Sequence, residues 1–373
     1  MGCSLSRADQ KTRPVTSRVG MLPQQEEDQR YEEEDEVYDD PDPQMYNYGG
    51  PEEDEERIPC EVSFQTLMSS PGEKRVFEYK FLRLIGRGTG AEVYLILNTE
   101  TNTYYAAKVY DKTMLQYNTL NNGPTIQKVL QEIQVMSMIK CKYCIQFKEV
   151  LEDQVYNAYY IIEEFADNGC LLPQKVKTTP IPEEKAKDVF FQICQGVRYL
   201  HSKNIVHRDL KPENIMTFSD GHVAIGDYSA ARFMIDSEYL DDTEGTPAFT
   251  SPEQFTGQPF KGKPADVWAC GVSLFIMLFG YVPFLDGSNN DSVYLAVWVR
   301  NSERVKNDPL VFPDSIPVSD DAKDLILHLM DKNPDTRFTI NDALHHKWFQ
   351  SLPNYNEVMS SLYLPSIAEK AQN

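Results

Sequence analysis

The sequence is short of basic residues. Its 373 residues include 57 Asp and Glu but only 36 Lys and Arg, which gives a formal net charge of -21 at pH 7. This deficit argues against a protein that binds nucleic acid through a basic surface, because phosphate contacts require clustered Lys and Arg side chains. The sequence also shows no apolar N-terminal stretch typical of a secretory signal. We also find no apolar run long enough to span a bilayer.

Cysteine is scarce as well. The seven cysteines are scattered, at positions 3, 60, 141, 144, 170, 194 and 270, and we interpret them as reduced thiols of a cytosolic protein. Cys141 and Cys144 have the spacing of half a zinc site, but no second CxxC or HxxxH pair accompanies them. We therefore favour two small residues near the start of a strand over a metal site.

The first six residues, Met1-Gly-Cys-Ser-Leu-Ser6, match the pattern for N-myristoylation with Gly2 as the acceptor. Cys3 offers a thiol for a second acyl chain, and stable anchoring takes two such signals. Four basic residues that would attract an anionic lipid surface follow: Arg7, Lys11, Arg13 and Arg18. Residues 1–20 are thus predicted to anchor the chain to the cytoplasmic face of a membrane. The alternative is a frayed terminus that matches the pattern by chance.

Residues 21–57 are strongly acidic, with 16 Asp or Glu against only Arg30 and Arg57. Such a segment, interrupted by Pro and Gly, cannot bury enough apolar surface to fold by itself. It is predicted to be a disordered linker that serves as a spacer. A tail that binds a basic partner is the alternative.

From about Phe77 onward, apolar and polar residues alternate on both sides of a glycine-rich turn, which indicates a strand, a loop and a second strand. Gly86-x-Gly88-x-x-Ala91-x-Val93 provides backbone that can approach phosphate groups closely, because glycine has no Cβ. Gly90 stands one place before the usual third glycine, whose place Ala91 takes. A Rossmann fold would need a helix directly after this loop, and here a strand is predicted.

Lys108 lies in the apolar, strand-like run Tyr-Tyr-Ala-Ala-Lys-Val-Tyr, where a buried ammonium group requires an anionic partner. Residues 125–141 follow with helical periodicity. The apolar stripe of this predicted helix consists of Ile126, Val129, Leu130, Ile133, Met136 and Ile139. Glu132 stands beside the stripe and is the candidate partner of Lys108, although a solvent-facing glutamate is the alternative.

The stretch His207-Arg-Asp-Leu-Lys-Pro-Glu-Asn214, together with the glycine-rich loop, Lys108 and Glu132, resembles the eukaryotic protein kinases over residues 75–350. The resemblance implies an α+β, two-lobed fold with a small β-rich N-lobe that carries one helix and a larger helical C-lobe. The N-lobe and hinge would span residues 75–165 and the C-lobe residues 166–350, followed by a tail over residues 351–373.

The resemblance also implies roles for individual residues. The residue matching Asp209 orients the substrate hydroxyl and accepts its proton, and the residue matching Asn214 holds Mg²⁺. Lys211 resembles the serine/threonine branch of the family, in which it contacts the transferred phosphoryl group. Lys108 and Glu132 would form the ion pair that positions the phosphates of ATP. The residues implied to contact ATP are Ile85, Gly86, Gly88, Gly90, Val93, Ala106, Lys108, Glu164, Ala166 and Met216.

Asp227 lies 13 residues after Asn214, in Ile-Gly-Asp-Tyr-Ser-Ala, and matches the metal-binding aspartate of the family's Asp-Phe-Gly element. Tyr228 keeps an aromatic ring where the family has phenylalanine. Ser229 replaces a glycine and restricts the backbone at positive φ, without removing a catalytic group. The site is therefore predicted to work. The three departures at Ala91, Tyr228 and Ser229 keep open the alternative of an acylated pseudokinase scaffold that binds partners without catalysis.

Four further segments look like the calcium/calmodulin-dependent protein kinase kinases and related activators of the AMP-activated protein kinase group. They are residues 102–112, 123–133, 168–173 and 245–253. The resemblance implies protein substrates, namely threonines in the activation loops of other serine/threonine kinases. The tail carries only Lys370 as a basic residue, which argues against a calmodulin-binding helix.

Two features remained open to more than one interpretation. The family pattern places Glu163 at the inner end of the nucleotide pocket, the gatekeeper position, whereas a shift by one residue would place Ile162 there. Cys170 would lie at the mouth of the pocket. The second feature is the set of acids that could pair with Arg208 in place of a phosphorylated residue: Asp236, Glu238, Asp241, Asp242 and Glu244. The alternative is that these acids form a solvated loop face.

Overall fold

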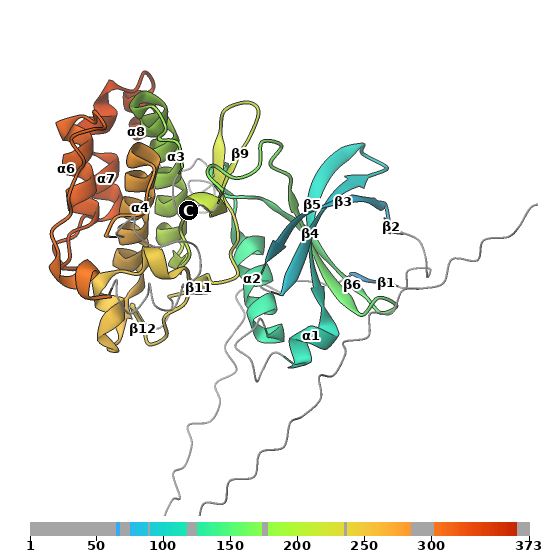
Figure 1. Cartoon of the computed structure of the whole chain (residues 1–373). Coiled ribbons are helices and arrows are strands. Elements are labelled where there is room, and N and C mark those ends of the chain that lie inside the picture. Colours follow the sequence, from blue (N-terminus) through green and yellow to red (C-terminus); the bar gives the residue numbers. More distant parts are fainter. Residues whose placement is uncertain are drawn as a thin grey trace, which may run out of the picture. The chain divides into compact units, whose positions relative to one another are not determined.

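The computed structural model describes residues 65–67, 75–88, 90–117, 125–173, 178–234, 237–284 and 302–363. Residues Arg57–Asn373 form one compact unit, which contains all of these segments. The predictions for Gly2, Cys3 and the acidic linker 21–57 lie outside the described residues and stay predictions. The predicted α+β architecture, a β-rich N-lobe followed by a helical C-lobe, is confirmed (Figure 1).

The N-lobe is built on one seven-stranded sheet with the order β1-β6-β7-β5-β4-β3-β2. Neighbouring strands pair antiparallel except for β1, which pairs in parallel with β6. The strands are β1 Gln65–Leu67, β2 Arg75–Val76, β3 Tyr79–Gly88, β4 Ala91–Asn98, β5 Thr103–Asp111, β6 Phe147–Asp153 and β7 Ala158–Glu164. The hairpin of β3 and β4 is the strand-loop-strand unit predicted around the glycine-rich turn.

Side chains alternate between the two faces of this sheet, as the period of two in the sequence requires. One face carries a compact apolar cluster made of Val76, Tyr79, Ile96, Ala107, Leu151, Ala158, Tyr160 and Ile162. The short helix α1 Lys112–Tyr117 and the longer helix α2 Ile126–Met138 follow β5. Both helices lie beside the sheet (Figure 1).

Helix α2 begins after Thr125, whose side-chain oxygen caps the helix by accepting a hydrogen bond from the Lys128 N–H. Most of the predicted stripe is buried, but Leu130 is 41% exposed and its place in the stripe was wrong. Val135, which the stripe omitted, is fully buried instead. The helix contacts the C-lobe segment after β10 as well as the sheet, because the Gln131 amide donates to the Ala231 carbonyl oxygen at 2.7 Å. This second contact shifts the buried arc away from Leu130.

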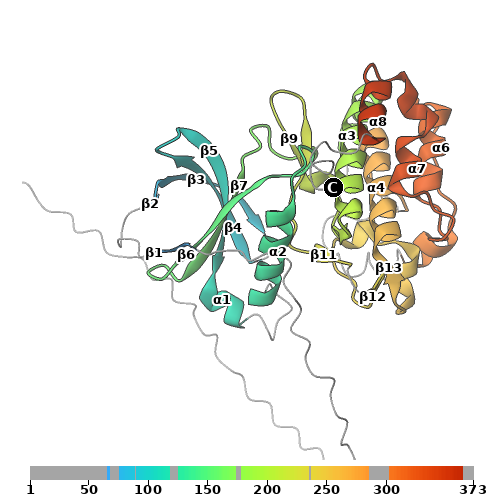
Figure 2. The same cartoon turned by 180° about the vertical axis from the view of Figure 1, so that it is seen from behind.

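The C-lobe is centred on two long helices, α3 and α4, that lie side by side (Figures 1 and 2). Its helices are α3 Glu183–Ser202, α4 Gly262–Phe279, α6 Asp320–Leu329, α7 Ile340–Leu344 and α8 Tyr355–Tyr363. Its 3-10 helices are η2 Pro212–Asn214, η3 Pro247–Phe249, η4 Pro252–Thr256 and η5 Lys347–Ser351. These helices surround the largest apolar core among the described residues, here called the main core, which also reaches α2 of the N-lobe.

Helix α4 corrects one expectation. Its 18 residues reach the length and mean hydropathy of a membrane span, so the sequence does contain one such run. However, 83% of the helix is buried within the protein. Its apolar side chains are therefore covered by neighbouring C-lobe elements, as in the core helix of a globular domain.

Short two-stranded ladders position the loops between α3 and α4. The pairs are β8 Ile205–Val206 with β11 Arg232–Phe233, β9 Ile215–Thr217 with β10 Val223–Ile225, and β12 Tyr239–Leu240 with β13 Phe260–Lys261. The segment from Asp227 to Glu253 is consequently paired with other C-lobe strands at two points, β11 and β12. We call this stretch the activation segment.

The ion pair implied between Glu253 and Arg337 is present. The two terminal nitrogens of the Arg337 guanidinium, Nη1 and Nη2, donate to the Glu253 carboxylate at 2.7 and 2.8 Å, and the Arg337 side chain is fully buried. Arg337 also donates to the carbonyl oxygens of Asp331 and Pro264. The pair fastens the end of the activation segment to the C-lobe, which is a structural role.

The segment predicted as a tail is partly folded. Helix α8 lies within residues 351–373, and its Met359 is only 8% exposed in the main core. The Tyr355 hydroxyl donates to the Leu344 carbonyl oxygen at 3.2 Å. A boundary at residue 350 therefore separates α8 from the core against which it packs.

Candidate active site

Lys108 is the centre of a charged network at the N-lobe side of the cleft. Its ammonium group lies 2.7 Å from the Glu132 carboxylate of α2 and 2.8 Å from the Asp227 carboxylate of the C-lobe. Glu132 is 2% exposed, and its second oxygen accepts a hydrogen bond from the Tyr110 hydroxyl at 2.7 Å. The ion pair predicted between Lys108 and Glu132 is thus present, and the solvent-facing alternative for Glu132 is wrong.

The electrostatics of this network keep its members charged. Burial disfavours the charged form of Lys108, but the carboxylates of Glu132 and Asp227 outweigh burial and raise its pKa well above the usual value. Burial alone would likewise raise the pKa of Asp227. The Lys108 ammonium outweighs that effect and holds the pKa of Asp227 well below its usual range. Asp227 is therefore an anion at physiological pH.

One buried aspartate, Asp266, supports the loop that carries Asp209 through hydrogen bonds to its backbone. Asp266, near the start of α4, accepts hydrogen bonds from the backbone N–H groups of His207 and Arg208, both at 2.8 Å. It also lies 2.9 Å from the ring nitrogen Nε2 of His201. Arg208 has a φ of +69°, an uncommon conformation for a non-glycine residue that these hydrogen bonds support.

Asp209 is surrounded by groups that fix its carboxylate. One oxygen accepts hydrogen bonds from the backbone N–H and the hydroxyl of Thr246, both at 2.8 Å. The other lies 2.7 Å from the Lys211 ammonium and 3.1 Å from the Asn214 amide nitrogen. The Lys211 ammonium also donates to the Thr246 hydroxyl at 2.7 Å. Sequence reasoning considered Thr246 only as a possible phosphorylation site and missed its contact with Asp209, for which the only signal was its place in the Gly-Thr-Pro stretch before Glu253.

Gly245 makes this approach possible. Its φ is +104°, and a Cβ added there would lie 2.3 Å from the Arg208 carbonyl oxygen. No larger residue fits between the activation segment and the loop that carries Asp209. The contact of Thr246 with Asp209 therefore depends on glycine at the preceding position.

The Asp-Tyr-Ser element is well accommodated. Asp227 itself has the positive φ, at +58°, whereas Ser229 is exposed and does not have a positive φ. The Tyr228 ring is fully buried and lies against His207, and its hydroxyl donates to the Ile225 carbonyl oxygen at 2.7 Å. The hydroxyl that distinguishes tyrosine from phenylalanine thus has its partner. Ser229 carries no backbone strain in this arrangement.

Replacing Ser229 by glycine is expected to preserve phosphoryl transfer, since the serine side chain is exposed. The variant should bind inhibitors that require the Asp227 loop to turn outward about two- to fivefold more tightly, because glycine widens the backbone freedom of the loop. Inhibitor affinity measured by calorimetry, with Ser229→Ala as the control, tests this expectation. Loss of most activity in Ser229→Gly would instead assign the serine hydroxyl a direct role.

The hinge register is resolved by the pairing of β5 with β7. Glu163 is the partner of Ala106, two residues from Lys108, so these side chains point to the cleft face of the sheet. Ile162 pairs with Ala107 and is 1% exposed in the apolar cluster on the opposite face. The structure therefore places Glu163, not Ile162, at the gatekeeper position. Burial raises the pKa of Glu163 to about 8, so this carboxyl group is mainly protonated at neutral pH.

The remaining residues implied to contact ATP lie on the glycine-rich hairpin of β3 and β4, on β5, at or just after the end of β7 and on β9. In the glycine-rich hairpin, Gly86 pairs with Val93 and Gly88 with Ala91. Ala91 begins β4 without a positive φ, so the missing third glycine causes no strain there. Beyond the hinge residues Glu164 and Ala166, Cys170 forms an isolated bridge with Met216. Ile85 lies on β3, in line with the same hairpin.

The activation segment presents two carboxylates to three cations. Asp242 lies 2.8 Å from the Arg208 guanidinium and 3.2 Å from that of Arg232 in β11. Glu244 lies 2.5 Å from the Lys128 ammonium in α2. Sequence reasoning left open whether one of these acids pairs with Arg208, and it missed Arg232 and Lys128, because their contacts with this segment cannot be read from local pattern.

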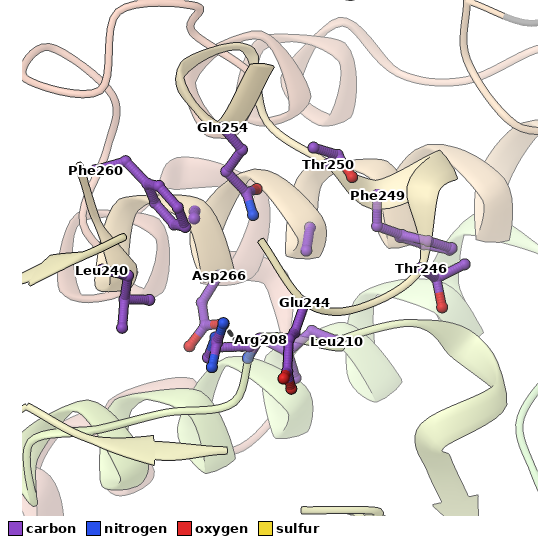
Figure 3. A pocket seen from close by; sticks show the side chains of 13 residues that line it. Arg208, Leu210, Leu240, Glu244, Thr246, Phe249, Thr250, Gln254, Phe260 and Asp266 are labelled. Carbon is purple, nitrogen blue, oxygen red and sulfur yellow. Dashed lines mark hydrogen bonds between the residues drawn. The ribbon is translucent and has the colours of Figure 1, made fainter. Parts of the chain in front are cut away.

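The other acids of the segment differ. Glu238 and Asp241 are exposed, and Asp236 lies outside the described residues. Figure 3 shows Arg208, Glu244 and Asp266 beside one small pocket between the activation segment and α4. None of the residues implied to contact ATP lines this pocket. Arg208 joins the activation segment to Asp266, because its guanidinium contacts Asp242 and its backbone N–H donates to Asp266. Asp266 in turn holds the loop that carries Asp209.

Comparisons with known proteins agree with this geometry. A protein kinase domain model matches residues 79–349. The chain is 34% identical over 281 residues to a probable serine/threonine-protein kinase of Dictyostelium discoideum, over 74% of this chain and 39% of that protein. It is 30% identical over 282 residues to the serine/threonine-protein kinase GRIK2 of Arabidopsis thaliana, over 74% of this chain and 66% of that protein. It is 33% identical over 283 residues to CBL-interacting protein kinase 32 of Oryza sativa subsp. japonica, over 74% and 60%.

The matched segment thus spans less than two thirds of the length of each of these relatives. The domain match covers well over half of the chain and includes every element that positions Lys108, Asp209 and Asp227. All three relatives are named as protein kinases, two of them as serine/threonine kinases. The chain therefore belongs to the eukaryotic protein kinase family.

Proposed function

We propose that this chain is an active serine/threonine kinase that transfers the γ-phosphate of ATP to hydroxyl groups of other proteins. The observation that carries the proposal is that both charged networks are complete, one around Lys108 and one around Asp209. Buried ion pairs are costly to maintain and are not required for binding alone. They therefore favour catalysis over a scaffold that only binds partners.

The geometry assigns a task to each group. Asp209, held by Thr246 and Lys211, orients the substrate hydroxyl and takes up its proton. Lys211 adds a positive charge close to the transferred phosphoryl group, and Lys108 binds the phosphates of ATP. These are the positioning and electrostatic contributions on which phosphoryl transfer depends.

The domain implies ATP and Mg²⁺, and the residues present fit the metal ion. Asp227 is anionic, and Asn214 donates its amide N–H groups to Asp209, which leaves the amide oxygen as its metal-binding atom. Carboxylate and amide oxygens are the ligands that Mg²⁺ accepts. When bound, Mg²⁺ neutralises the phosphate charge.

The proposed substrates are threonines in the activation loops of other kinases. Support comes from the four segments that look like the calcium/calmodulin-dependent protein kinase kinases, including residues 245–253 around Thr246. The three relatives described above do not bear that name, so the assignment to this subgroup stands on those segments.

The test is to incubate the full chain with γ-labelled Mg-ATP and catalytically dead candidate kinases, beside an Asp209→Asn control. We expect the label on an activation-loop threonine of at least one candidate, and none with the control. Label only on proteins outside the kinase family would overturn the substrate class. No Asp209-dependent transfer to any protein, including the chain itself, would overturn the proposed activity.

Residues 1–20 are further proposed to hold the kinase at the cytoplasmic face of a membrane. Gly2→Ala should move the protein to the soluble fraction, because it removes the acceptor of the first acyl chain. Cys3→Ser should weaken the association, since one acyl chain gives only marginal binding. Fractionation of cells that express each variant checks this, with Ser4→Ala as the control. Membrane association of both variants at the wild-type level would contradict the prediction.

A further inference from the structure

The turn between α2 and β6 brings two cysteines together. The Cys144 N–H donates to the Cys141 carbonyl oxygen at 3.0 Å, which closes a β-turn. The Gln146 amide donates to the carbonyl oxygens of both cysteines, at 2.7 and 2.6 Å, and so fixes the turn. The ends of a β-turn lie within about 7 Å, close to the span that a disulfide bridges. No cluster of three His, Cys, Asp or Glu forms a metal site in the part of the chain that the structure describes.

The two thiols have different surroundings. Cys144 is fully buried in the main core, and its thiol faces the Gly196 carbonyl oxygen at 3.9 Å. Cys141 is partly exposed. A hydrogen bond from Cys144, aided by the charges of Lys142 and Arg198, lowers the pKa of Cys141 to about 7 despite its partial burial. An accessible thiol with thiolate character thus stands beside a protected one, as in an attacking and resolving pair.

Cys144 is also connected to the active site. It forms a parallel bridge with Ile225, two residues before Asp227, and the Ile225 N–H donates to the Tyr143 carbonyl oxygen at 2.9 Å. Tyr228 is linked to the same residue, because its hydroxyl donates to the Ile225 carbonyl oxygen. Cys144 therefore supports Ile225 directly and Tyr228 through Ile225, one residue on each side of Asp227.

We propose that Cys141 and Cys144 form a redox modification site that a peroxide converts into an intramolecular disulfide. The Cys141 thiolate attacks the O–O bond of the peroxide, becomes a sulfenic acid and releases an alcohol, or water in the case of hydrogen peroxide. The Cys144 sulfur then attacks the Cys141 sulfur, forms the S–S bond and releases water. The two thiols lose two electrons in total, which the peroxide takes up, and a dithiol reductant reverses the change.

The disulfide should also reduce phosphoryl transfer. Once bonded to Cys141, the Cys144 sulfur has no S–H group for the contacts it makes in the reduced chain, and it must shift toward the turn. That shift removes support from Tyr228 and Ile225 on both sides of Asp227. This second consequence rests on the proposed kinase activity, whereas disulfide formation does not.

The direct test is differential alkylation of the full chain before and after hydrogen peroxide, followed by peptide mapping. We expect Cys141 and Cys144 to lose alkylation together, with a mass 2 Da below the dithiol, and dithiothreitol to restore both. Cys144→Ser should leave Cys141 as a sulfenic or sulfinic acid, whereas Cys141→Ser should leave Cys144 reduced. Oxidation of Cys141 in the wild-type chain while Cys144 stays alkylatable would overturn the proposal.

Activity is the second readout, measured in a Cys170→Ser background so that the thiol near the nucleotide cleft cannot contribute. Peroxide should lower transfer several-fold and reversibly, and Cys141→Ser should protect the activity. Full activity of the mapped disulfide form would overturn the link to Tyr228. A chain that is inactive before any oxidation would contradict the proposed function, while the mapping would still decide whether the disulfide forms.

Discussion

A Glu132→Gln variant is expected to lose about 150- to 5,000-fold in phosphoryl transfer. Glu132 is buried and holds both the Lys108 ammonium and the Tyr110 hydroxyl at 2.7 Å. Glutamine keeps the shape but removes the charge, so the Lys108 ammonium, 12% exposed, retains only Asp227 as an anionic partner. Breaking a buried ion pair from one side costs about 3–5 kcal/mol, which corresponds to this loss if Lys108 leaves its position.

Mg²⁺ binding at Asp227 should weaken as well, because Lys108, once released by Glu132, competes with Mg²⁺ for the Asp227 carboxylate. The KM for ATP should therefore rise while kcat falls. The matched control is Glu152→Gln, which breaks an ion pair with Lys112 in the same lobe but outside the Lys108 network. A partly exposed pair contributes at most about 1 kcal/mol, so the control should stay within about fivefold of wild type. Steady-state kinetics at saturating protein substrate and varied ATP measure kcat and the KM for ATP of both variants and of the wild type. A Glu132→Gln enzyme with more than a tenth of wild-type kcat would contradict the assigned role.

The active-site residues that lie close together in the sequence were predictable. His207 to Asn214 and the spacing to Asp227 could be read directly, because one loop and one strand pair carry them. The structure then brings Lys108 within 2.8 Å of Asp227, 119 positions away in sequence. The partners from β11 and α2 were missed for the opposite reason. Arg232 and Lys128 carry no local signal, since their partners approach only after the two lobes have folded.

Periodicity also has a physical limit. It identified the apolar stripe of α2 but placed Leu130 in it and omitted Val135, because the helix packs against more than the sheet. At the hinge, a strand pattern is unchanged when its register shifts by one residue while its faces are exchanged. Only the pairing of β7 with β5 shows that Glu163 faces the cleft. Burial of α4 could not be read from its composition, since a core helix and a membrane span share the same apolar residues.

The activation segment places its own acids against Arg208 and Lys128, and this arrangement has a measurable consequence. In many kinases the cation next to the catalytic aspartate is neutralised by a phosphorylated residue. Here Arg208, whose side chain is 6% exposed, lies 2.8 Å from Asp242. Burial would raise the pKa of Asp242, but Arg208 and Arg232 hold it below its usual value, so the carboxylate is charged. Glu244 adds a second link, to Lys128 of α2.

Protein made in bacteria and treated with phosphatase is therefore expected to be active already. Asp242→Asn combined with Glu244→Gln should lower kcat by about 10- to 100-fold, since the buried Arg208 loses a charged partner whose hydrogen bond contributes about 1.5–3 kcal/mol. The more exposed pair of Glu244 with Lys128 adds little to this loss. The matched control is Glu238→Gln combined with Asp241→Asn, which removes the same two charges from exposed positions of the segment and should have little effect. Thr243→Ala should also have little effect, because Thr243 is exposed and the acids on either side of it make the contacts.

Thr246 separates this mechanism from control by phosphorylation. Its hydroxyl already donates to the Asp209 carboxylate at 2.8 Å, so a phosphate on Thr246 would place two like charges at the catalytic residue. Phosphorylation there should inhibit the enzyme rather than activate it. A phosphatase-treated protein that is inert, and that regains activity only when Thr243 or Thr246 is phosphorylated, would contradict the built-in acids. It would then follow that Arg208 depends on an upstream kinase.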